Sequence, residues 1–450
     1  MHFTLARCLI SPPPVFKGFD RLISLKLRCV IISSKSLGSL ISHCPLLENL
    51  ELTYLDNSNP VEISAPKLKS FVFRGNIRLI HLNNVPLLSN VSYKPKEFSV
   101  EAEHDLGKIF EFIPALKNLR WRHDFVHVML PYTLNRLKRL NICCITLGEF
   151  FALCLIRSSP NLKEFGIEVY GYLDGDYDEP VPQDAVDDIP ASFSDMTLNN
   201  LRTVKIYGVT GAAAEMQLIK HDAITDHIEI SAPKLRSFIF TGGINFLHLK
   251  NVPLLSKVSY EPTEFHVKAE HDVGKIFESI PSLENLCWIN DCVQDVRVGP
   301  AEVIPTKLPY ALHCLKRLYI SGITLGEFFD VSFALCLIRS SPNLEEIEIE
   351  MYVVSHEDYF VHVTREAVDE IHASFSDMTF NRLRTIKLSN VAGAGAEMQL
   401  IKVLLAKSPA LVKMVIDPYR MKAEKSLKVL TEITNFQRAS SKAQVGYNVD

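Results

Sequence analysis

The stretch Leu47-Glu-Asn-Leu-Glu-Leu52 decides the fold of this chain. It reads apolar-x-x-apolar-x-apolar, and its second half alternates in the way that a β-strand with one buried face does. The pattern returns at Leu116-Lys-Asn-Leu-Arg-Trp121 and recurs along the chain in typical steps of about 20–29 residues, which is the spacing of stacked coils in a repeat protein. Further instances begin at Leu22, Leu68, Leu88, Leu137, Leu162, Leu201, Leu235, Leu255, Leu283, Leu315, Leu344, Leu383 and Leu411.

Many of these strands are followed by segments with helical periodicity, in which apolar residues lie three and four positions apart. Such outer helices are predicted at 105–113, 147–156 and 396–405. The runs 77–82 and 244–249 come only nine residues after the preceding motif, which is too short for a full coil, so we expect return strands on the outer side there. The fold class is therefore an α/β leucine-rich-repeat solenoid, a horseshoe with a parallel concave sheet and irregular convex helices.

A longer repeat contains the shorter one. Ser64-Ala-Pro-Lys-Leu-Lys-Ser70 returns as Ser231-Ala-Pro-Lys-Leu-Arg-Ser237, and residues 61–220 as a whole recur as 228–402. The offset between the copies is 167 at first and grows to 178 and then 182, which indicates two insertions in the second copy, one near 290–304 and one at 330–333. A tandem duplication, or a gene model that merges two genes, would produce this pattern.

The composition excludes several classes of function. Hydrophobic residues make up 47% of the chain and charged residues 22%, with a net charge of −4, so a packed interior is expected and a run of positive charge is not present. We therefore expect neither nucleic acid nor a membrane as partner, since both require a clustered positive face or a long apolar segment. The first ten residues make a poor signal peptide, and the ten cysteines have no zinc-type spacing, so they are interpreted as reduced core residues of a cytoplasmic or nuclear protein.

No candidate for catalysis, cofactor binding or metal binding remains after each is compared with a structural explanation. The acidic loop 174–179 lacks the later glutamate of a calcium loop, and the pairs His104-Asp105 and His271-Asp272 lie where an aspartate that caps a helix is expected. The glycines of 208–211 are not followed by a phosphate-binding motif and are interpreted as turns. The sequence predicts that the chain is not an enzyme and needs no cofactor.

Several segments resemble one plant protein family. Ala65-Pro-Lys-Leu-Lys-Ser-Phe71 and His43-Cys-Pro-Leu-Leu-Glu-Asn-Leu-Glu-Leu52 are similar to its repeats, and 383–388, 404–416 and 436–443 are similar to the successive elements of its C-terminal domain. The family is that of the plant F-box proteins that join leucine-rich repeats to an FBD domain. The resemblance implies a solenoid over 1–380 and an FBD-like domain over 381–450.

The resemblance also implies a function, which is to bind the substrate of an SCF-type ubiquitin ligase. In that family an N-terminal F-box docks on a Skp-type adaptor, but residues 1–20 show neither its leucine-proline opening nor its serine-lysine-x-tryptophan stretch. Binding of a Skp-type adaptor is therefore doubtful. The alternatives are a binding module or decoy outside any ligase, or the product of a duplicated or merged gene.

The candidate partner-binding residues flank the buried positions of each strand and are expected to form a parallel array on the concave face. Arginine and tyrosine are frequent anchors of protein interfaces, and the three glutamates of 346–350 form an acidic row suited to a basic partner. The alternative for any one of these residues is a merely solvated strand position. The candidates are Asn49, Glu51, Thr53, Arg120, Arg122, Arg139, Asn141, Arg317, Tyr319, Glu346, Glu348, Glu350, Lys387 and Lys413. An amphipathic segment at 422–433 is expected to cap the last open edge of the array.

Overall fold

The structure of the chain is a computed structural model, and it forms two compact units, Met1–Ile228 and Glu229–Asp450. The boundary between them falls where the sequence places the start of the second copy. The residues that the structure describes are 1–11, 13, 18–55, 59–75, 80–94, 112–122, 133–145, 155–156, 158–169, 199–209, 228–242, 247–262, 277–290, 306–325, 328–352, 371 and 375–448.

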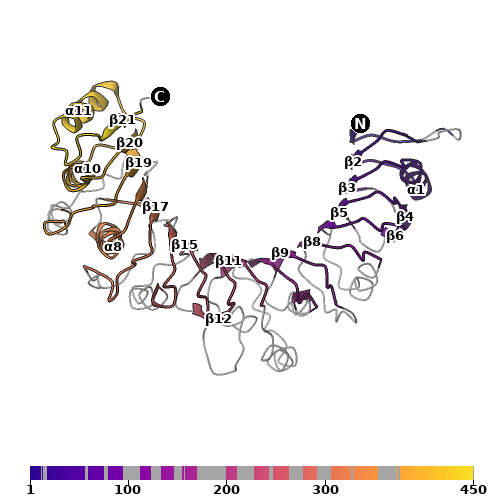
Figure 1. Cartoon of the computed structure of the whole chain (residues 1–450). Coiled ribbons are helices and arrows are strands. Elements are labelled where there is room, and N and C mark those ends of the chain that lie inside the picture. The colour runs from indigo at the N-terminus through magenta and orange to yellow at the C-terminus, as the bar shows by residue number, and fades with distance from the viewer. Residues whose placement is uncertain are drawn as a thin grey trace, which may run out of the picture. The chain divides into compact units, whose positions relative to one another are not determined.

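The first unit is built on a parallel sheet whose strands pair in chain order, so each coil adds one strand beside the previous one (Figure 1). In this ladder Leu50 lies between Leu25 and Phe71, and all three side chains are buried. The strands are β1 (His2–Ala6), β2 (Ser24–Arg28), β3 (Asn49–Thr53), β5 (Ser70–Arg74), β7 (Asn90–Lys94), β8 (Asn118–Arg122), β9 (Arg139–Ile145), β10 (Glu164–Val169) and β11 (Thr203–Val209).

The second unit repeats this arrangement with its own chain-ordered parallel strands. Gly322 has a φ of 75° and lies where the register between the strands 317–323 and 346–351 shifts. It therefore forms a β-bulge, in a backbone conformation that residues with a side chain rarely adopt. The strands are β13 (Ser237–Gly242), β15 (Lys257–Glu261), β16 (Asn285–Ile289), β17 (Arg317–Ile323), β18 (Glu346–Met351), β19 (Thr385–Val391), β20 (Lys413–Pro418) and β21 (Gln444–Tyr447). The predicted leucine-rich-repeat solenoid with a parallel sheet is confirmed.

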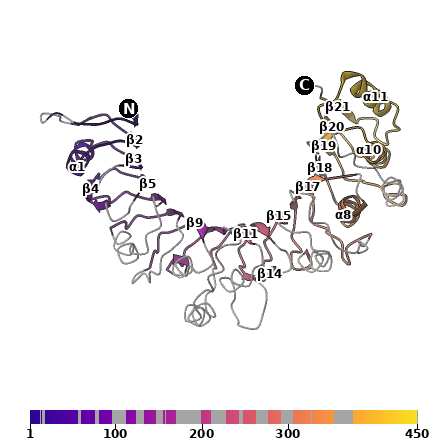
Figure 2. The ribbon, with the colours of Figure 1, turned by 180° about the vertical axis from the view of Figure 1, so that it is seen from behind.

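Helices and short return strands cover one side of each sheet (Figures 1 and 2). The predicted return strands are confirmed, because the structure has a two-stranded sheet of β4 and β6 in the first copy and another of β12 and β14 in the second. The outer elements are α1 (Ser34–Ser42), β4 (Val61–Ser64), β6 (Ile80–Asn83), β12 (Ile228–Ser231), β14 (Leu247–Lys250), α8 (Phe328–Arg339), α10 (Gly395–Lys407) and α11 (Ala423–Thr434). The helix predicted at 396–405 is thus confirmed, whereas most of 105–113 and most of 147–156 lie outside the described residues.

Buried aromatic rings form a matching stack in the core of each unit. In the first unit the ring of Tyr93 lies 4.5 Å from that of Trp121, and in the second Tyr260 lies 4.7 Å from Trp288, measured between ring centroids. The tyrosine hydroxyls, although buried, each donate a hydrogen bond to a glycine carbonyl, at 3.1 Å in the first unit and 2.9 Å in the second. Phe333 lies 4.5 Å from Trp288, so part of the 330–333 insertion packs into the core.

The C-terminal tail closes the second unit differently from the prediction. The helix expected at 422–433 is present as α11, but the edge of β20 is paired with β21. α11 packs instead over the loop before α10, where Val429 occupies the space that a β-carbon on Gly393 would need. A boundary between 380 and 381 stays a prediction; the strands on its two sides, β18 and β19, pair with each other.

Candidate protein-binding face

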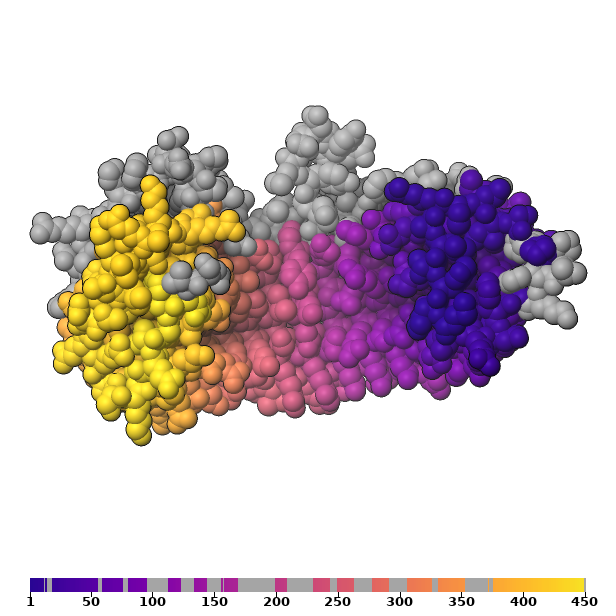
Figure 3. Space-filling model, turned by 90° about the horizontal axis from the view of Figure 1, so that it is seen from above, coloured from indigo at the N-terminus to yellow at the C-terminus, as the bar shows by residue number. Residues whose placement is uncertain are grey.

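In each unit the side of the parallel sheet away from the helices and return strands presents alternate side chains to solvent. We call this side the open face. Strand positions two residues apart share it because successive side chains point to opposite sides of a sheet. Figure 3 looks onto the strands, and within each unit the side chains of consecutive strands lie side by side there.

In the first unit the structure places six of the seven predicted residues on the open face, at three successive outward positions of the strands. Glu51, Arg120 and Asn141 occupy the middle outward position of β3, β8 and β9, and Arg120 and Asn141 are direct partners in register. Asn49 and Arg139 occupy the position before it, and Arg122 the position after it. These six side chains are exposed or half-buried, as a binding surface requires.

Neighbouring strands supply counter-charges for two of these residues. The carboxylate of Glu51 lies 3.2 Å from the Nζ of Lys26, and the Nε of Arg139 lies 3.0 Å from a carboxylate oxygen of Glu164. Both pairs are solvent-exposed and contribute about 0–1 kcal/mol each. They fix side-chain positions on the face more than they stabilise the fold.

Thr53 is a correction to the prediction. It was expected on the open face but is buried, with 2% of its surface exposed. In register it lies between Arg28 on β2 and Arg74 on β5. Lys413, in contrast, is exposed at the start of β20.

The absence of a side chain at Gly166 leaves room for the side chain of Asn141. The two residues are partners in register on β10 and β9, and a β-carbon on Gly166 would clash with the Oδ1 of Asn141. Any other residue at this position would force the asparagine to move.

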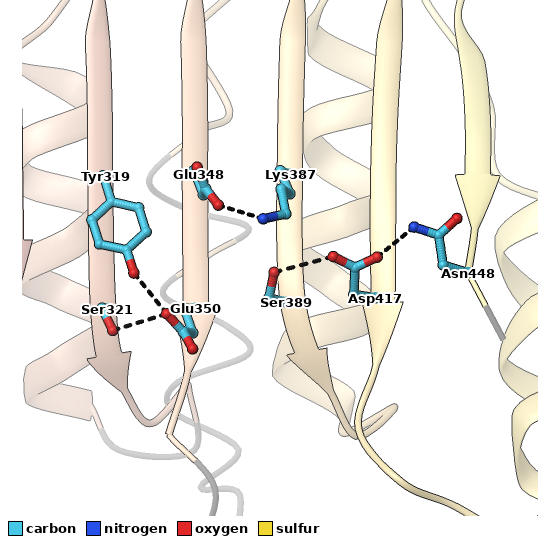
Figure 4. A network of polar contacts seen from close by, with 8 residues as sticks. All are labelled: Tyr319, Ser321, Glu348, Glu350, Lys387, Ser389, Asp417 and Asn448. Carbon is cyan, nitrogen blue, oxygen red and sulfur yellow. Dashed lines mark hydrogen bonds and ion pairs between the residues drawn. The ribbon is translucent and has the colours of Figure 1, made fainter. Parts of the chain in front are cut away.

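In the second unit the predicted residues form pairs across neighbouring strands (Figure 4). The Nζ of Lys387 on β19 donates to the Oε1 of Glu348 on β18 at 2.6 Å. This hydrogen bond raises the pKa of the lysine. One strand further back, the Nε of Arg317 lies 3.2 Å from a carboxylate oxygen of Glu346.

Glu350 is held by neutral groups. The hydroxyl of Tyr319 donates to its Oε2 at 2.6 Å and the hydroxyl of Ser321 donates to the same oxygen at 3.2 Å (Figure 4). Burial and the hydrogen bond to the carboxylate together raise the pKa of Tyr319 to about 12. The phenol therefore stays protonated and remains a donor to Glu350 at neutral pH.

The pairs border a shallow hollow of about 440 Å³ on the open face of the second unit, which spans β13 to β19. Residues at the first and middle outward positions of the strands line it. Five predicted site residues of this unit lie together there, and Glu350 and Lys413 lie outside the lining. The five are Arg317, Tyr319, Glu346, Glu348 and Lys387.

The acidic row of 346–350 is less negative than its sequence indicates. Glu346 and Glu348 each have a cation on the neighbouring strand, and of the three glutamates only Glu350 is contacted by neutral donors alone. Selection of a basic partner by this row stays a prediction, and it now depends on Glu350.

Asp417 belongs to the same network, and the sequence prediction missed it. It accepts hydrogen bonds from the Oγ of Ser389 at 3.3 Å and from the Nδ2 of Asn448 at 2.6 Å (Figure 4). The alternation that placed Lys387 and Lys413 on the open face also places Ser389 and Asp417 there, so this signal was present in the sequence. The position of Asn448 follows only from the pairing of β21 with β20.

The cysteines whose side chains the structure describes are free thiols, namely Cys8, Cys29, Cys44, Cys143, Cys287, Cys314 and Cys336. Burial raises the pKa of Cys44, Cys143 and Cys287, which keeps these thiols protonated and weakly nucleophilic. Cys29 and Cys314 are exposed, so the prediction that the cysteines lie in the core is wrong for these two, which lie in turns next to strands.

The other sequence candidates are not brought together in the described part of the chain. The acidic loop 174–179 and both His-Asp pairs lie outside the described residues. Among the residues that are described, no group of three or more histidine, cysteine or acidic side chains is arranged to hold a metal ion. Within the same residues, no helix is both long enough and apolar enough to cross a membrane.

Comparison with known proteins gives the same assignment as the repeats. Residues 1–106 match the family model described as FBD-associated F-box protein At5g56370, LRR repeats. The chain is 30% identical over 234 residues to the F-box/FBD/LRR-repeat protein At1g13570 of Arabidopsis thaliana, an alignment that covers 48% of this chain and 55% of that protein. It is 28% identical over 197 residues to the F-box/LRR-repeat protein At1g67190 of the same plant, covering 41% of this chain and 42% of that protein.

The chain spans about half the length of the curated relatives it matches. Their printed names share the leucine-rich repeat with this chain, and stacked repeats of this kind form extended surfaces that bind other proteins. The chain is therefore a leucine-rich-repeat module of the protein-interaction type and is similar to plant F-box/FBD/LRR-repeat proteins, as its motifs predicted.

Proposed function

We propose that this chain recognises the substrate of an SCF-type ubiquitin ligase and binds it through the open face. The observation that carries the proposal is the hollow of about 440 Å³ in the second unit, bordered by Tyr319, Arg317 and the Glu348–Lys387 pair. A tyrosine and an arginine beside a depression are the residue types that dominate binding energy at protein interfaces. The similarity to F-box/FBD/LRR-repeat proteins supports the ligase role.

Photo-crosslinking from the open face tests the binding surface. Tyr319 is replaced by benzoylphenylalanine, which keeps an aromatic ring at this position, and the matched control carries the same group at Lys402, an exposed residue of the outer helix α10. We expect a defined protein adduct from position 319 and none from position 402. Equal labelling from both positions would show that the open face has no special role.

A second measurement separates the ligase role from the alternative, a binding module or decoy outside any ligase. The purified chain is mixed with a purified Skp-type adaptor, and complex formation is measured by size-exclusion chromatography. Complex formation, together with a longer lifetime of the crosslinked protein in cells that lack the chain, supports the substrate-receptor role. If the adaptor does not bind and the lifetime is unchanged, the non-ligase module is the correct function.

The proposal assigns no reaction and no cofactor to the chain, and it places the protein in the cytoplasm or the nucleus. The free thiols of the described cysteines support this location, because reducing compartments keep thiols unpaired. A fluorescent fusion observed in plant cells tests it, and a signal confined to the secretory pathway would contradict it.

A further inference from the structure

A cluster of cations lies in the first unit at the edge of the sheet where the strands begin. A lysine stands directly before the first residue of three consecutive strands: Lys117 before β8, Lys138 before β9 and Lys163 before β10. Arg136 lies in the turn before β9. Together with three asparagines they line a hollow of about 550 Å³ that contains no acidic side chain. We call these four cations the basic rim.

The basic rim is held in place by the backbone ladder. The carbonyl of Lys117 accepts a hydrogen bond from the N–H of Lys138 at 2.8 Å, and the carbonyl of Lys138 accepts one from the N–H of Lys163 at 2.8 Å. The backbones of the three lysines are therefore separated by the distance between adjacent strands, about 4.8 Å. The positive charges are stacked by the fold itself.

The cations of the basic rim have no counter-charge among the described residues. None of the four forms an ion pair there, and the nearby Glu164 is already paired with Arg139 at 3.0 Å. Neighbouring like charges repel one another, so an unneutralised stack costs free energy that a bound anionic group would recover.

The second unit shows that the fold does not need these charges. The same backbone contacts recur there: the carbonyl of Glu284 accepts from the N–H of Lys316 at 2.9 Å, and that of Lys316 from the N–H of Glu345 at 2.8 Å. By the sequence offsets, Glu284, Cys314 and Glu345 stand where the basic rim has Lys117, Arg136 and Lys163. The one retained cation, Lys316, is paired with Glu284 at 3.1 Å.

We propose that the basic rim is a docking site for an acidic peptide segment of a partner protein, separate from the open face. The hollow extends from the start of β8 to the start of β11, three strand spacings or about 14 Å, which matches about four residues of an extended peptide. Nucleic-acid binding in contrast draws on a longer track of about 6–10 phosphate contacts. The three asparagines that border the hollow are neutral, and their side-chain nitrogens donate to neighbouring residues, so the charge of the site comes from the four cations.

The test measures binding of the full chain to a fluorescently labelled peptide of alternating glutamate and alanine, by anisotropy. A triple variant, Lys117→Glu with Arg136→Ser and Lys163→Glu, gives the first unit the charges that the second unit already has at these positions. We expect it to bind the peptide about tenfold more weakly or worse, because three attractive contacts are removed and two become repulsive. Thermal unfolding checks that the variant remains folded.

Two further variants make the result specific. A control with the same change in net charge, Lys402→Glu with Arg420→Ser and Lys442→Glu, alters exposed cations of the second unit outside the open face and is expected to bind the peptide as the parent does, within about twofold. The reverse exchange, Glu284→Lys with Cys314→Arg and Glu345→Lys, is expected to add a second peptide-binding site to the chain.

The proposal is overturned if the parent chain does not bind the peptide, or if the triple variant and the net-charge control lose binding equally. It is also overturned if a DNA duplex of equal charge competes as well as unlabelled peptide, since the site would then be a nucleic-acid surface. The inference does not depend on the ligase role, because neither the adaptor nor the open face takes part in this experiment.

Discussion

Replacing Ile320 by alanine measures how much one inward strand position contributes to the second unit. Ile320 has no exposed surface and lies in register between Trp288 on β16 and Ile349 on β18. The substitution removes three carbon atoms, and at about 0.8 kcal/mol per buried methylene this loses about 2.4 kcal/mol of transfer free energy. The cavity left between two strands adds to this, so we expect the free energy of unfolding to fall by about 3–4 kcal/mol.

The chain provides its own optical reporters for this assay. Its two tryptophans are divided between the units, Trp121 on β8 and Trp288 on β16. In a Trp121→Phe background, urea unfolding followed by tryptophan fluorescence therefore reports the second unit alone. The midpoint is the quantity to compare, since the cavity also alters the intensity of the neighbouring Trp288.

Arg317→Ala on the same strand is the matched control. Its side chain points to the open face and its exposed pair with Glu346, at 3.2 Å, contributes about 0–1 kcal/mol. If the isoleucine and arginine variants shift the midpoint equally, the assignment of alternate residues to core and open face is wrong.

Three further predictions follow from single features of the second unit. Gly322→Ala is expected to destabilise the unit by at least about 1–3 kcal/mol, because its φ of 75° disfavours a side chain and a β-carbon would clash with the backbone of Asn290. Gly446→Ala is the control in the same urea assay, since its β-carbon would meet nothing closer than 3.9 Å. If both variants are equally stable, the assignment of a bulge to Gly322 is wrong. Glu350→Gln is expected to lower the pKa of Tyr319 from about 12 without returning it to 10.0, because burial is the larger cause of the shift, and an ultraviolet titration against Tyr319→Phe measures this pKa. In the parent, the folded state holds the phenol proton more tightly than the unfolded state does. The contribution of this proton to stability is therefore complete below pH 10.0 and is lost as the pH rises through about 12. An unchanged tyrosine pKa in Glu350→Gln would show that the hydrogen bond has no influence on this titration. Truncation after Asp417 removes α11 and β21 and leaves the edge of β20 unpaired. The shortened chain is therefore expected to self-associate, which light scattering measures. A shortened chain that stays monomeric and unfolds at the parent's temperature would show that the tail does not protect this edge.

The strands were predictable because their signal is local. An apolar position every second residue, preceded by a leucine three residues earlier, fixes both the strand and the face that it buries. The short return strands were also predictable, since nine residues between motifs leave no room for a helix. In contrast, β1 has no leading leucine, and its strand follows only from pairing with β2.

The chemistry between strands could not be read from the sequence, because it depends on register. The pairs Lys387–Glu348 and Arg317–Glu346 join residues 39 and 29 positions apart, and only the ladder shows that they are neighbours. The basic rim was missed for the same reason, as its cations come from separate coils and form no run of positive charge. Thr53 was misplaced because alternation along a strand gives the side of the sheet but not how much of a side chain its neighbours leave exposed.

The 330–333 insertion lies within α8, on the outer side of the second unit. Across the strands that flank it, Arg317 still lies opposite Glu346, just as Arg139 lies opposite Glu164 in the first unit, where the chain is four residues shorter at this point. Growth or loss of chain on the outer side therefore leaves the neighbours on the open face unchanged. The two copies thus differ in length behind the sheet while the side chains in front of it keep their register.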